Sequence, residues 1–301
     1  MCDQCPRSAI NWVDSHVCTR DQLILTHSEL PIPGLRTFGW QDLKCAAPAL
    51  CLHYHQDCLE LTFVLEGSIQ FFTEGRSYDV FGGDAFLTQP NAVHSTNELP
   101  FSVGEVVWVQ LDTSRADGFL FLQEEAAAPL IAALHDADQC HIRTDNNAPK
   151  RAVQALVKSV RNAPQELDAY KVAAFLVFYL YQLLPFIGRT MNRVSPDIQA
   201  VCAYIHDNLR AELTLEDLAQ HGGLSVSQFK YKFKAQIGIS PRSYINQMKI
   251  EQIKEQIVPG VSFTDLAAEY SFCNSAYFSA VFKKYAGMTP SEYLASNRNP
   301  K

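Results

Sequence analysis

An internal repeat in the last hundred residues constrains the fold of this 301-residue chain more than any other feature of its sequence. Three blocks of residues recur at an offset of 48 or 49 positions. Three matching blocks at one offset predict two successive copies of one helical unit. The paired blocks are Leu213–Ala219 with Val261–Ala267, Phe229–Lys234 with Phe278–Lys283, and Gly238–Tyr244 with Gly287–Tyr293.

The first copy predicts a short helix, a turn at His221–Leu224 and a second helix. Ser225 with Gln228 is a capping box, which opens that second helix. Phe229 and Phe233 lie one helical turn apart, so both are expected on the buried face. The opposite face is expected to carry Ser227, Lys230, Tyr231 and Lys234.

The second copy follows the same plan. Asn274 or Ser275 is the expected cap of its second helix, and Phe278 and Phe282 are the expected core residues. Small, hydroxyl and basic residues on a free helix face can reach base edges in a major groove. An amphipathic helix with a solvated basic face would explain either copy alone, but two copies with matching caps and cores argue against it. The outward residues are expected to be Ala276, Ser279, Ala280 and Lys283.

These last hundred residues resemble the AraC-type family of transcription regulators, and the signature lies in 272–293. It includes Tyr277-Phe278-Ser279, Phe282-Lys283-Lys284 and Gly287-Met288-Thr289-Pro290. In that family each unit's second helix enters the major groove, and a long helix, here about Pro241–Ile257, joins the units. Lys249 stands where the family usually has Arg in that helix. The resemblance implies base contacts by Ser227, Lys230, Tyr231, Ala276, Ser279 and Ala280, and phosphate contacts by Lys234, Lys283 and Lys284.

The distribution of charge permits DNA binding although the whole chain is acidic, with a net charge of −7. Residues 1–194 carry 14 basic and 22 acidic side chains, whereas residues 195–301 carry 11 and 10. DNA binding requires a basic face rather than a basic total, so the acidic first part does not exclude it.

Residues from about 35 to 112 predict short strands separated by turns, as in a sandwich or a barrel. Leu59–Glu66 and Ile69–Thr73 flank Gly67-Ser68, which predicts a hairpin. From about 116 to 186 the apolar period becomes helical. A wide apolar stripe between Val172 and Leu183 must be buried against its own domain or against a second subunit.

A histidine pattern lies in the β-rich half. His53 and His55 are separated by one residue, so both imidazoles point to the same face of a strand. Glu60 and His94 follow, and together the four residues resemble the ligand positions of cupins, small β-barrels that AraC-type regulators commonly carry. In metal-binding cupins the matching residues hold a divalent metal, and three histidines with a carboxylate suit Fe, Mn, Ni or Zn.

Three interpretations of this set stay open: hydrogen bonds to a small organic effector such as a metabolite or sugar, a metal site, or histidines of the barrel core. Pro90 lies four rather than five residues before His94, which departs from the metal-cupin pattern. Tyr78 and Trp108 are candidate walls of an effector pocket. Cys51 shares the strand parity of His53, so its thiol is also expected to face the pocket.

The sequence therefore predicts an α+β chain of two domains. A cupin-like effector-sensing β-barrel is expected over 1–115, a helical dimerisation segment over 116–187, a linker over 188–196, and an all-α DNA-binding domain with two helix-turn-helix units over 197–301. The expected function is a ligand-responsive regulator, not an enzyme, that binds double-stranded promoter DNA. The family resemblance implies a homodimer and an activator that acts on RNA polymerase.

Two alternatives remain: a metal-dependent cupin enzyme fused to a DNA-binding tail, and a regulator that senses thiol oxidation or metal. A cytoplasmic protein without a membrane segment is expected, because Val172–Leu184 is short and interrupted by polar residues and the N-terminus lacks the apolar region of a signal peptide. Nine cysteines, an odd number that includes Cys2 and Cys5, predict reduced thiols rather than a disulfide framework.

Overall fold

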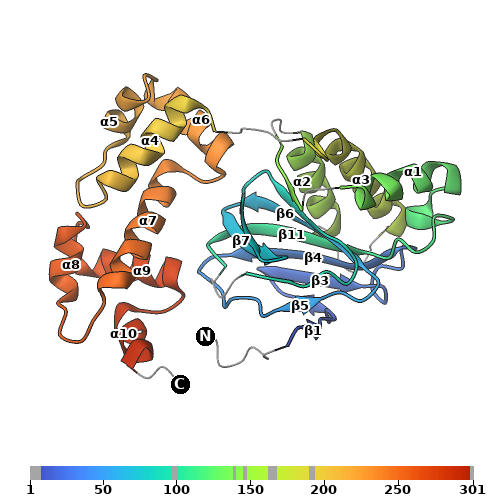
Figure 1. The fold of residues 1–301 in the computed structure, drawn as a ribbon, viewed down its shortest axis with the longest axis horizontal. Helices are drawn as coiled ribbons and strands as arrows, with labels where there is room; N and C mark the ends of the chain where they lie inside the picture. Colours follow the sequence, from blue (N-terminus) through green and yellow to red (C-terminus); the bar gives the residue numbers. More distant parts are fainter. Residues whose placement is uncertain are drawn as a thin grey trace. The chain divides into compact units, whose positions relative to one another are not determined.

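The computed structural model describes residues 8–96, 101–137, 140–144, 148–161, 168–189 and 194–298. Contacts divide the chain into two compact units, one built mainly from residues before 194 and one mainly from residues after it. The first unit is rich in strands, and the second is helical (Figure 1). The Cys2–Cys5 pair and residues 190–193 of the expected linker lie outside the described residues.

The strands of the first unit form two sheets, and neither closes on itself. The smaller has the order β1-β5-β10-β7-β8, and the larger has the order β12-β9-β6-β11-β4-β3-β2. The closed barrel of the sequence prediction is therefore replaced by two open sheets. Their strands are β1 (Ile10–Asn11), β2 (Val17–Cys18), β3 (Gln22–Thr26), β4 (Leu35–Leu43), β5 (His53–Tyr54), β6 (Leu59–Glu66), β7 (Ser68–Thr73), β8 (Arg76–Phe81), β9 (Ala85–Thr88), β10 (His94–Ser95), β11 (Gly104–Leu111) and β12 (His141–Ile142).

The hairpin predicted around Gly67 is wrong, although both of its strands exist. β6 pairs with β9 and β11 in the larger sheet, whereas β7 pairs with β8 and β10 in the smaller one. Gly67, with φ of 97°, carries the chain from one sheet to the other. The tight hairpin instead joins β7 to β8 through Glu74 and Gly75, whose φ angles of 51° and 76° suit a two-residue turn.

Strand β6 has two buried faces with different chemistry. Leu59, Leu61 and Phe63 point to the helices and join the main hydrophobic core of the unit. Glu60 and Thr62 point the other way, since side chains alternate along a strand, and they are 8% and 5% exposed. The larger sheet thus separates an apolar layer from a polar interior.

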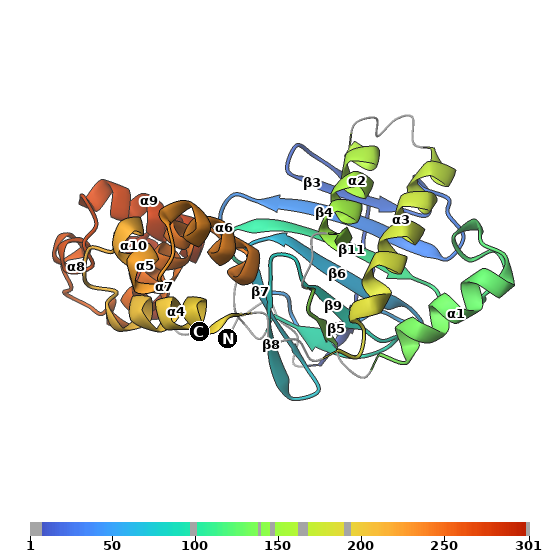
Figure 2. The same ribbon diagram turned by 90° about the horizontal axis from the view of Figure 1, so that it is seen from above.

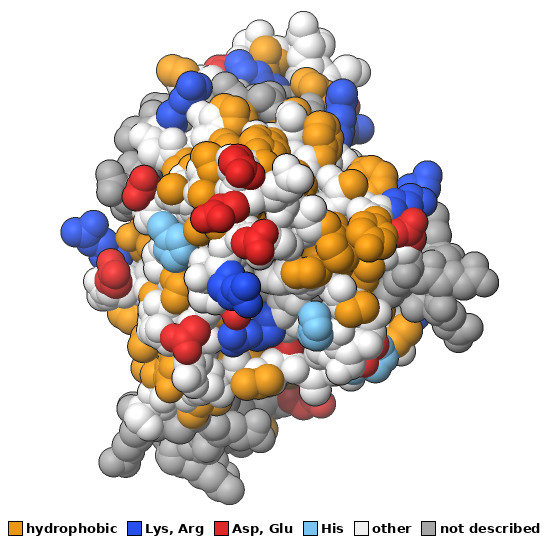
Figure 3. Space-filling model, turned by 90° about the vertical axis from the view of Figure 1, so that its right-hand side faces the viewer, with side chains coloured by type: hydrophobic (Ala, Val, Ile, Leu, Met, Phe, Trp, Pro, Cys, Tyr) orange, Lys and Arg blue, Asp and Glu red, His pale blue; other side chains and the backbone are white. Residues whose placement is uncertain are grey.

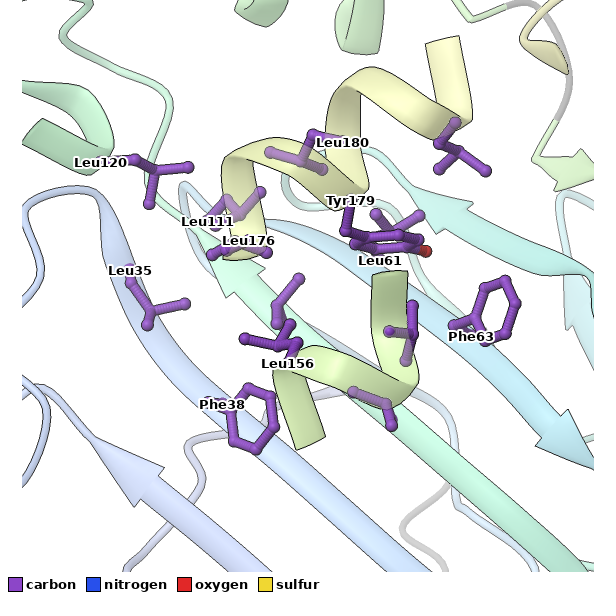
Figure 4. Close-up of a cluster of buried hydrophobic side chains, with 14 of the residues drawn as sticks. Leu35, Phe38, Leu61, Phe63, Leu111, Leu120, Leu156, Leu176, Tyr179 and Leu180 are labelled. Atoms are coloured by element: carbon purple, nitrogen blue, oxygen red, sulfur yellow. The ribbon is translucent and has the colours of Figure 1, made fainter. Parts of the chain in front are cut away.

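Helices cover the apolar face of the larger sheet. Figure 2 shows α2 (Ala148–Arg161) and α3 (Ala169–Leu183) lying across it. Figure 4 shows Leu156 of α2 and Leu176 of α3 in the cluster of buried side chains above the sheet. Tyr179 of α3 meets Phe63 of the sheet edge to face, with ring centres 5.7 Å apart. The remaining helices of this unit are η1 (Phe119–Phe121), α1 (Glu124–His135) and η2 (Leu184–Phe186).

Helix α3 and the turn after it, Ala169–Phe186, have the length and composition of a membrane-spanning helix, with a mean hydropathy of 1.4. This stretch is longer than the 13 residues considered from sequence. One side of it, including Leu176 and Leu180, is fully buried in the core of the unit, and a buried core helix has the same composition as a span.

The second unit repeats one helix pair. α5 (Leu215–His221) and α8 (Phe263–Glu269) have seven residues each, and α6 (Val226–Ile237) and α9 (Ser275–Ala286) have twelve each. All four begin at a residue whose side chain accepts a backbone N–H, which satisfies one free donor of the first turn. These caps are Thr214, Ser225, Ser262 and Asn274. The other helices are α4 (Pro196–Asp207), α7 (Pro241–Gln256) and α10 (Pro290–Arg298).

The repeat also governs how α6 and α9 end and pack. Gly238 and Gly287 follow them with φ of 85° and 78°, the left-handed conformation that glycine adopts without strain. Phe229 with Phe233 and Phe278 with Phe282 are fully buried. Each pair occupies the predicted inner face, which leaves the opposite face of each helix outside the core.

Candidate DNA interface and ligand site

The free face of α6 lies where the sequence predicted it. Ser227, Lys230, Tyr231 and Lys234 are all exposed. Tyr231 is 72% exposed, an unusual position for a large aromatic side chain in a folded protein. A hydroxylated ring beside two lysines can stack on or hydrogen-bond to a nucleic acid.

Helix α9 presents a smaller and less polar face. Ala276, Ala280, Lys283 and Lys284 are exposed, whereas Ser279 is half-buried. The Ser279 hydroxyl donates to the Ser275 carbonyl at 2.9 Å, so it is satisfied within its own helix. The two alanines leave the backbone of α9 accessible to a close partner.

Lys232 occupies a position on α6 beside the buried Phe233, and the structure shows what holds it there. Its Nζ atom lies 2.6 Å from Oδ2 of Asp197 in α4. The hydrogen bond from Lys232 lowers the pKa of Asp197 to about 2. Lys232 therefore joins α6 to α4 and does not belong to the exposed basic face.

A cluster of three histidines and a carboxylate lies in the first unit, where the two sheets face each other. His53 is on β5 and His94 is on β10 of the smaller sheet, His55 follows β5, and Glu60 is on β6 of the larger one. The three imidazoles are 0–3% exposed. We call these four residues the histidine cluster.

The ring nitrogens of the histidine cluster are divided between two roles. Each Nδ1 atom lies by a backbone carbonyl: His53 by Cys51 at 2.8 Å, His55 by Trp12 at 3.1 Å and His94 by Ala92 at 3.1 Å. A carbonyl can only accept, so each Nδ1 is the donor. One ring nitrogen from each histidine lies within 4.8 Å of the others, in an arrangement that could hold a metal ion. Outer hydrogen bonds of this kind fix the rings of metal-binding histidines.

Glu60 supplies the negative charge of the cluster. Its Oε2 lies 2.8 Å from Nε2 of His55, and its Oε1 lies 3.6 Å from Nε2 of His94. Burial opposes ionisation, but hydrogen bonds from the two histidines outweigh it and hold the pKa of Glu60 well below its usual value. Burial also opposes protonation of His55, yet the Glu60 hydrogen bond and charge raise its pKa.

Among the described residues, none forms an ion pair with His53. Burial, together with the nearby His94, lowers the pKa of His53 to about 4. Its imidazole is therefore neutral near pH 7 and available as a ligand or acceptor. Glu60 and the three histidines can together hold a cation or the polar groups of a small molecule.

Sequence reasoning missed a second group of residues around the cluster. Asp14 accepts hydrogen bonds from Nε1 of Trp108 at 3.0 Å and from Nε2 of Gln110 at 3.1 Å. Gln110 also donates to Glu60 at 3.2 Å, and the Trp12 ring centre lies 5.6 Å from that of His53. Burial raises the pKa of Asp14. Gln110 could have been found from the sequence, because it is a polar residue in a strongly apolar strand. Nothing in the sequence around Trp12 and Asp14 indicates that they lie near the cluster.

The two aromatic wall candidates are placed differently. Trp108 lies at the cluster through Asp14, and its ring covers Gly39 so closely that a Cβ atom there would be 1.9 Å away. Tyr78 packs against Phe86 with ring centres 5.7 Å apart. Of the two, Trp108 is the one connected to the histidine cluster, through Asp14 and Gln110.

The expectation of reduced thiols holds for six of the described cysteines and is wrong for Cys51. Cys51 is disulfide-bonded, so it offers no thiol to the pocket. Burial raises the pKa of Cys58 to about 12 and that of Cys202 to about 11, which makes both thiols unreactive. The described free cysteines are Cys18, Cys45, Cys58, Cys140, Cys202 and Cys273.

A separate cavity of about 440 Å³ lies on the helix-covered side of the larger sheet, between that sheet and α2. Arg161 borders it, with its guanidinium 3.7 Å from the centre of the Trp40 ring. None of the four residues of the histidine cluster lines this cavity. Its lining residues are Leu65, Glu105, Gln154, Val157, Lys158 and Arg161.

Comparison with known proteins bears on the second unit above all. Residues 218–296 match a family described as a helix-turn-helix domain. An uncharacterized HTH-type transcriptional regulator of Staphylococcus aureus (strain MSSA476) is 24% identical over 245 residues, which are 78% of this chain and 31% of that protein. The chain thus spans about a third of the length of that relative.

The MmsAB operon regulatory protein of Pseudomonas aeruginosa is 28% identical over 221 residues, which are 72% of this chain and 67% of that protein. Among solved structures, a transcriptional regulator from Chromobacterium violaceum, described as containing an AraC-type DNA-binding domain, is 20% identical. It covers 35% of this chain and 96% of its own, with a TM-score of 0.33.

Proposed function

We propose that this chain, whose residues 218–296 form a helix-turn-helix domain of the AraC type, regulates transcription by binding promoter DNA through α6 and α9. One observation carries the proposal: two helices of equal length, capped alike at both ends, each leave a lysine-bearing face outside the core. A twelve-residue helix with such a face fits a major groove. We therefore treat the two helix pairs as two helix-turn-helix units.

The exposed residues divide by chemistry into two groups. Lys230 and Tyr231 carry the hydrogen-bonding groups that can distinguish base edges, with Ser227 at the start of the same helix. On α9, Ala276 and Ala280 allow close approach, and Ser279 can contribute once its hydroxyl turns from its own helix. Lys234, Lys283 and Lys284 supply charge for phosphates.

Duplex binding by the full chain tests this assignment. The three phosphate lysines of each chain should release counterions, so affinity should fall about 40-fold between 50 and 200 mM salt for each chain that binds. Fluorescence anisotropy with duplexes selected from a random library would measure the slope. A chain that selects and shifts no duplex at low salt would disprove DNA binding.

For the first unit we propose a ligand-sensing role in a cupin-like pair of sheets. The support is the histidine cluster, which places four polar groups in a buried interior where they are costly without a partner. A small metabolite or sugar could satisfy them through hydrogen bonds. Loading of this site would then change regulation by the DNA-binding unit, and we propose activation through RNA polymerase as the output in the cytoplasm.

A divalent metal is the ligand that the ring geometry favours. With every Nδ1 donating to a carbonyl, the other ring nitrogens of His53, His55 and His94 can serve as metal ligands, and Glu60 adds a carboxylate. A bound metal would displace the proton that His55 donates to Glu60. When bound, Fe, Mn, Ni or Zn would supply a Lewis-acidic centre for an effector oxygen. The protein residues would hold and orient it, with Gln110 and Asp14 supporting Glu60 and His55.

We also propose a homodimer formed through α3. Tyr170, Phe178 and Tyr181 are 71%, 51% and 45% exposed, and with the exposed Ala174 they follow one stripe of the helix. Phe121 of η1 extends the patch by stacking on Tyr170 at 4.4 Å. Hydrophobic side chains form patches on this end of the first unit (Figure 3). Soluble proteins rarely leave such a stripe uncovered, and a second copy offers the same stripe in return.

Charge on this stripe should separate the subunits. The double substitution Phe178→Glu and Tyr181→Glu is expected to weaken self-association by at least about 100-fold, since each buried aromatic contributes about 1.5–3 kcal/mol. Light scattering coupled to size-exclusion chromatography would measure the molar mass in solution. Arg76→Glu, a charge reversal at an exposed position on β8 of the smaller sheet, is the matched control and should leave the mass unchanged. A monomeric wild type, or a variant that stays dimeric, would contradict the proposal.

A further inference from the structure

The turn between α8 and α9 is held from α7 at two points. Tyr270, which ends α8, is fully buried. The Lys249 ammonium on α7 donates to the Tyr270 carbonyl at 2.7 Å, and the amide of Gln256, the last residue of α7, donates to the Tyr270 hydroxyl. The helix that joins the two pairs therefore holds the second pair at its turn.

Lys249 also reaches the first pair. Its Nζ atom lies 3.5 Å from the carbonyl of Ala211, in the loop that leads into α5, and 5.6 Å from the centre of the Phe272 ring. The side chain is only 6% exposed. A buried ammonium that loses its acceptors is costly, so the protein retains the geometry that supplies both carbonyls.

The loop and the turn also contact each other directly. The Ser271 hydroxyl donates to the Arg210 carbonyl at 2.7 Å, and Ser271 has a φ of 55°, which is strained for a residue other than glycine. Arg210 and Glu269 form an ion pair at 3.1 Å, but both are exposed, so that pair contributes little. In addition to the hydrophobic core that the two helix pairs share, the bonds of Lys249 and Ser271 tie the turn between α8 and α9 to the loop before α5.

We propose that Lys249 is a positioning residue that fixes the separation and angle between α6 and α9, so that the chain accepts one spacing between two DNA half-sites. This rests on the proposed DNA binding by both helices. Each base pair inserted between the half-sites moves the second by about 3.4 Å and turns it by about 34°. A rigid pair of helices cannot follow that displacement, whereas a loosened pair can follow part of it.

The test measures spacing tolerance with the full-length chain. The probes are a duplex selected by wild type from a random 30-base-pair library and two derivatives with one or two base pairs inserted between the two half-sites that α6 and α9 of a single chain cover. Wild type should lose at least 100-fold in affinity with two inserted pairs. Lys249→Met, which keeps the aliphatic stem, should bind the selected duplex about tenfold more weakly but lose less than tenfold on insertion. Lys249→Arg, which restores donors, should regain the wild-type penalty.

Two further variants keep the proposal falsifiable. Ser271→Gly removes the hydroxyl and relieves the positive φ, so it should fold and lower the insertion penalty several-fold. Arg210→Ala removes only the exposed ion pair and should keep the wild-type penalty. If Lys249→Met folds and its loss of affinity on insertion equals that of wild type, the proposal is overturned. If Lys249→Met does not fold, Ser271→Gly decides instead, and an unchanged loss of affinity in that variant overturns the proposal. If wild type binds DNA but loses no affinity on insertion, the spacing proposal is wrong and the proposed DNA binding stands. If wild type selects no duplex at all, the proposed function is wrong as well.

Discussion

Tyr231→Ala and Lys230→Ala should each lower the preference for the selected duplex over unrelated DNA by about 10- to 100-fold. Both side chains lie on the exposed face of α6, and a base contact typically contributes about 1–3 kcal/mol of discrimination. Lys284→Ala should instead weaken all sequences alike and reduce the salt slope by about 1, because a phosphate contact carries no sequence information.

Competition binding at several salt concentrations separates these two effects. Lys158→Ala, an exposed lysine of α2 in the first unit, is the matched control and should change neither preference nor slope. If Tyr231→Ala, Lys230→Ala and Lys284→Ala all lower affinity uniformly, α6 does not read bases with this face. Some other element would then carry sequence preference.

His55→Ala and Glu60→Ala should abolish loading of the histidine cluster while DNA binding in the absence of effector persists. The loss of a ligand that is buried and fixed by its neighbours is expected to lower metal affinity by at least about 100-fold. Elemental analysis of purified wild type should find about one divalent metal per chain, and the variants should contain none. A promoter–reporter assay should show loss of the regulated response.

The controls and alternative outcomes of this experiment are distinct. His16→Ala changes an exposed histidine of the same unit and should leave both metal and response intact. Purified wild type could instead contain no metal, while an organic compound raises its melting temperature and fails to do so in the two variants. That result would mean that the cluster binds an organic effector directly. Metal-dependent turnover of a substrate would favour the cupin enzyme fused to a DNA-binding tail. A full regulated response in the promoter–reporter assay with both variants would show that His55 and Glu60 only pack the interior.

The helical unit could be predicted closely because its determinants are local. The caps at Ser225 and Asn274 and the buried pairs such as Phe229 with Phe233 involve residues three or four positions apart, and the helical period places them without knowledge of the rest of the fold. Because the unit occurs twice, the same pattern of caps and buried phenylalanines could be recognised independently in each copy. What the repeat did not reveal is the set of contacts that Lys249 makes with Ala211 and Tyr270, since these join separate helices and loops.

In the first unit, the sequence by itself identified the strands between about 35 and 112, and alternation along a strand placed His53 and His55 on one face. Glu60 and His94 were joined to them through the resemblance to cupins. Only the tertiary structure decided which strands pair. A strand that follows another through Gly67 can form a hairpin or cross to a second sheet, and packing across the whole unit selects between them. Only the tertiary structure brought Asp14 to Trp108 and Gln110, 94 and 96 positions away. Hydrogen bonds over such separations leave no periodic trace in a sequence, since they depend on how complete sheets stack.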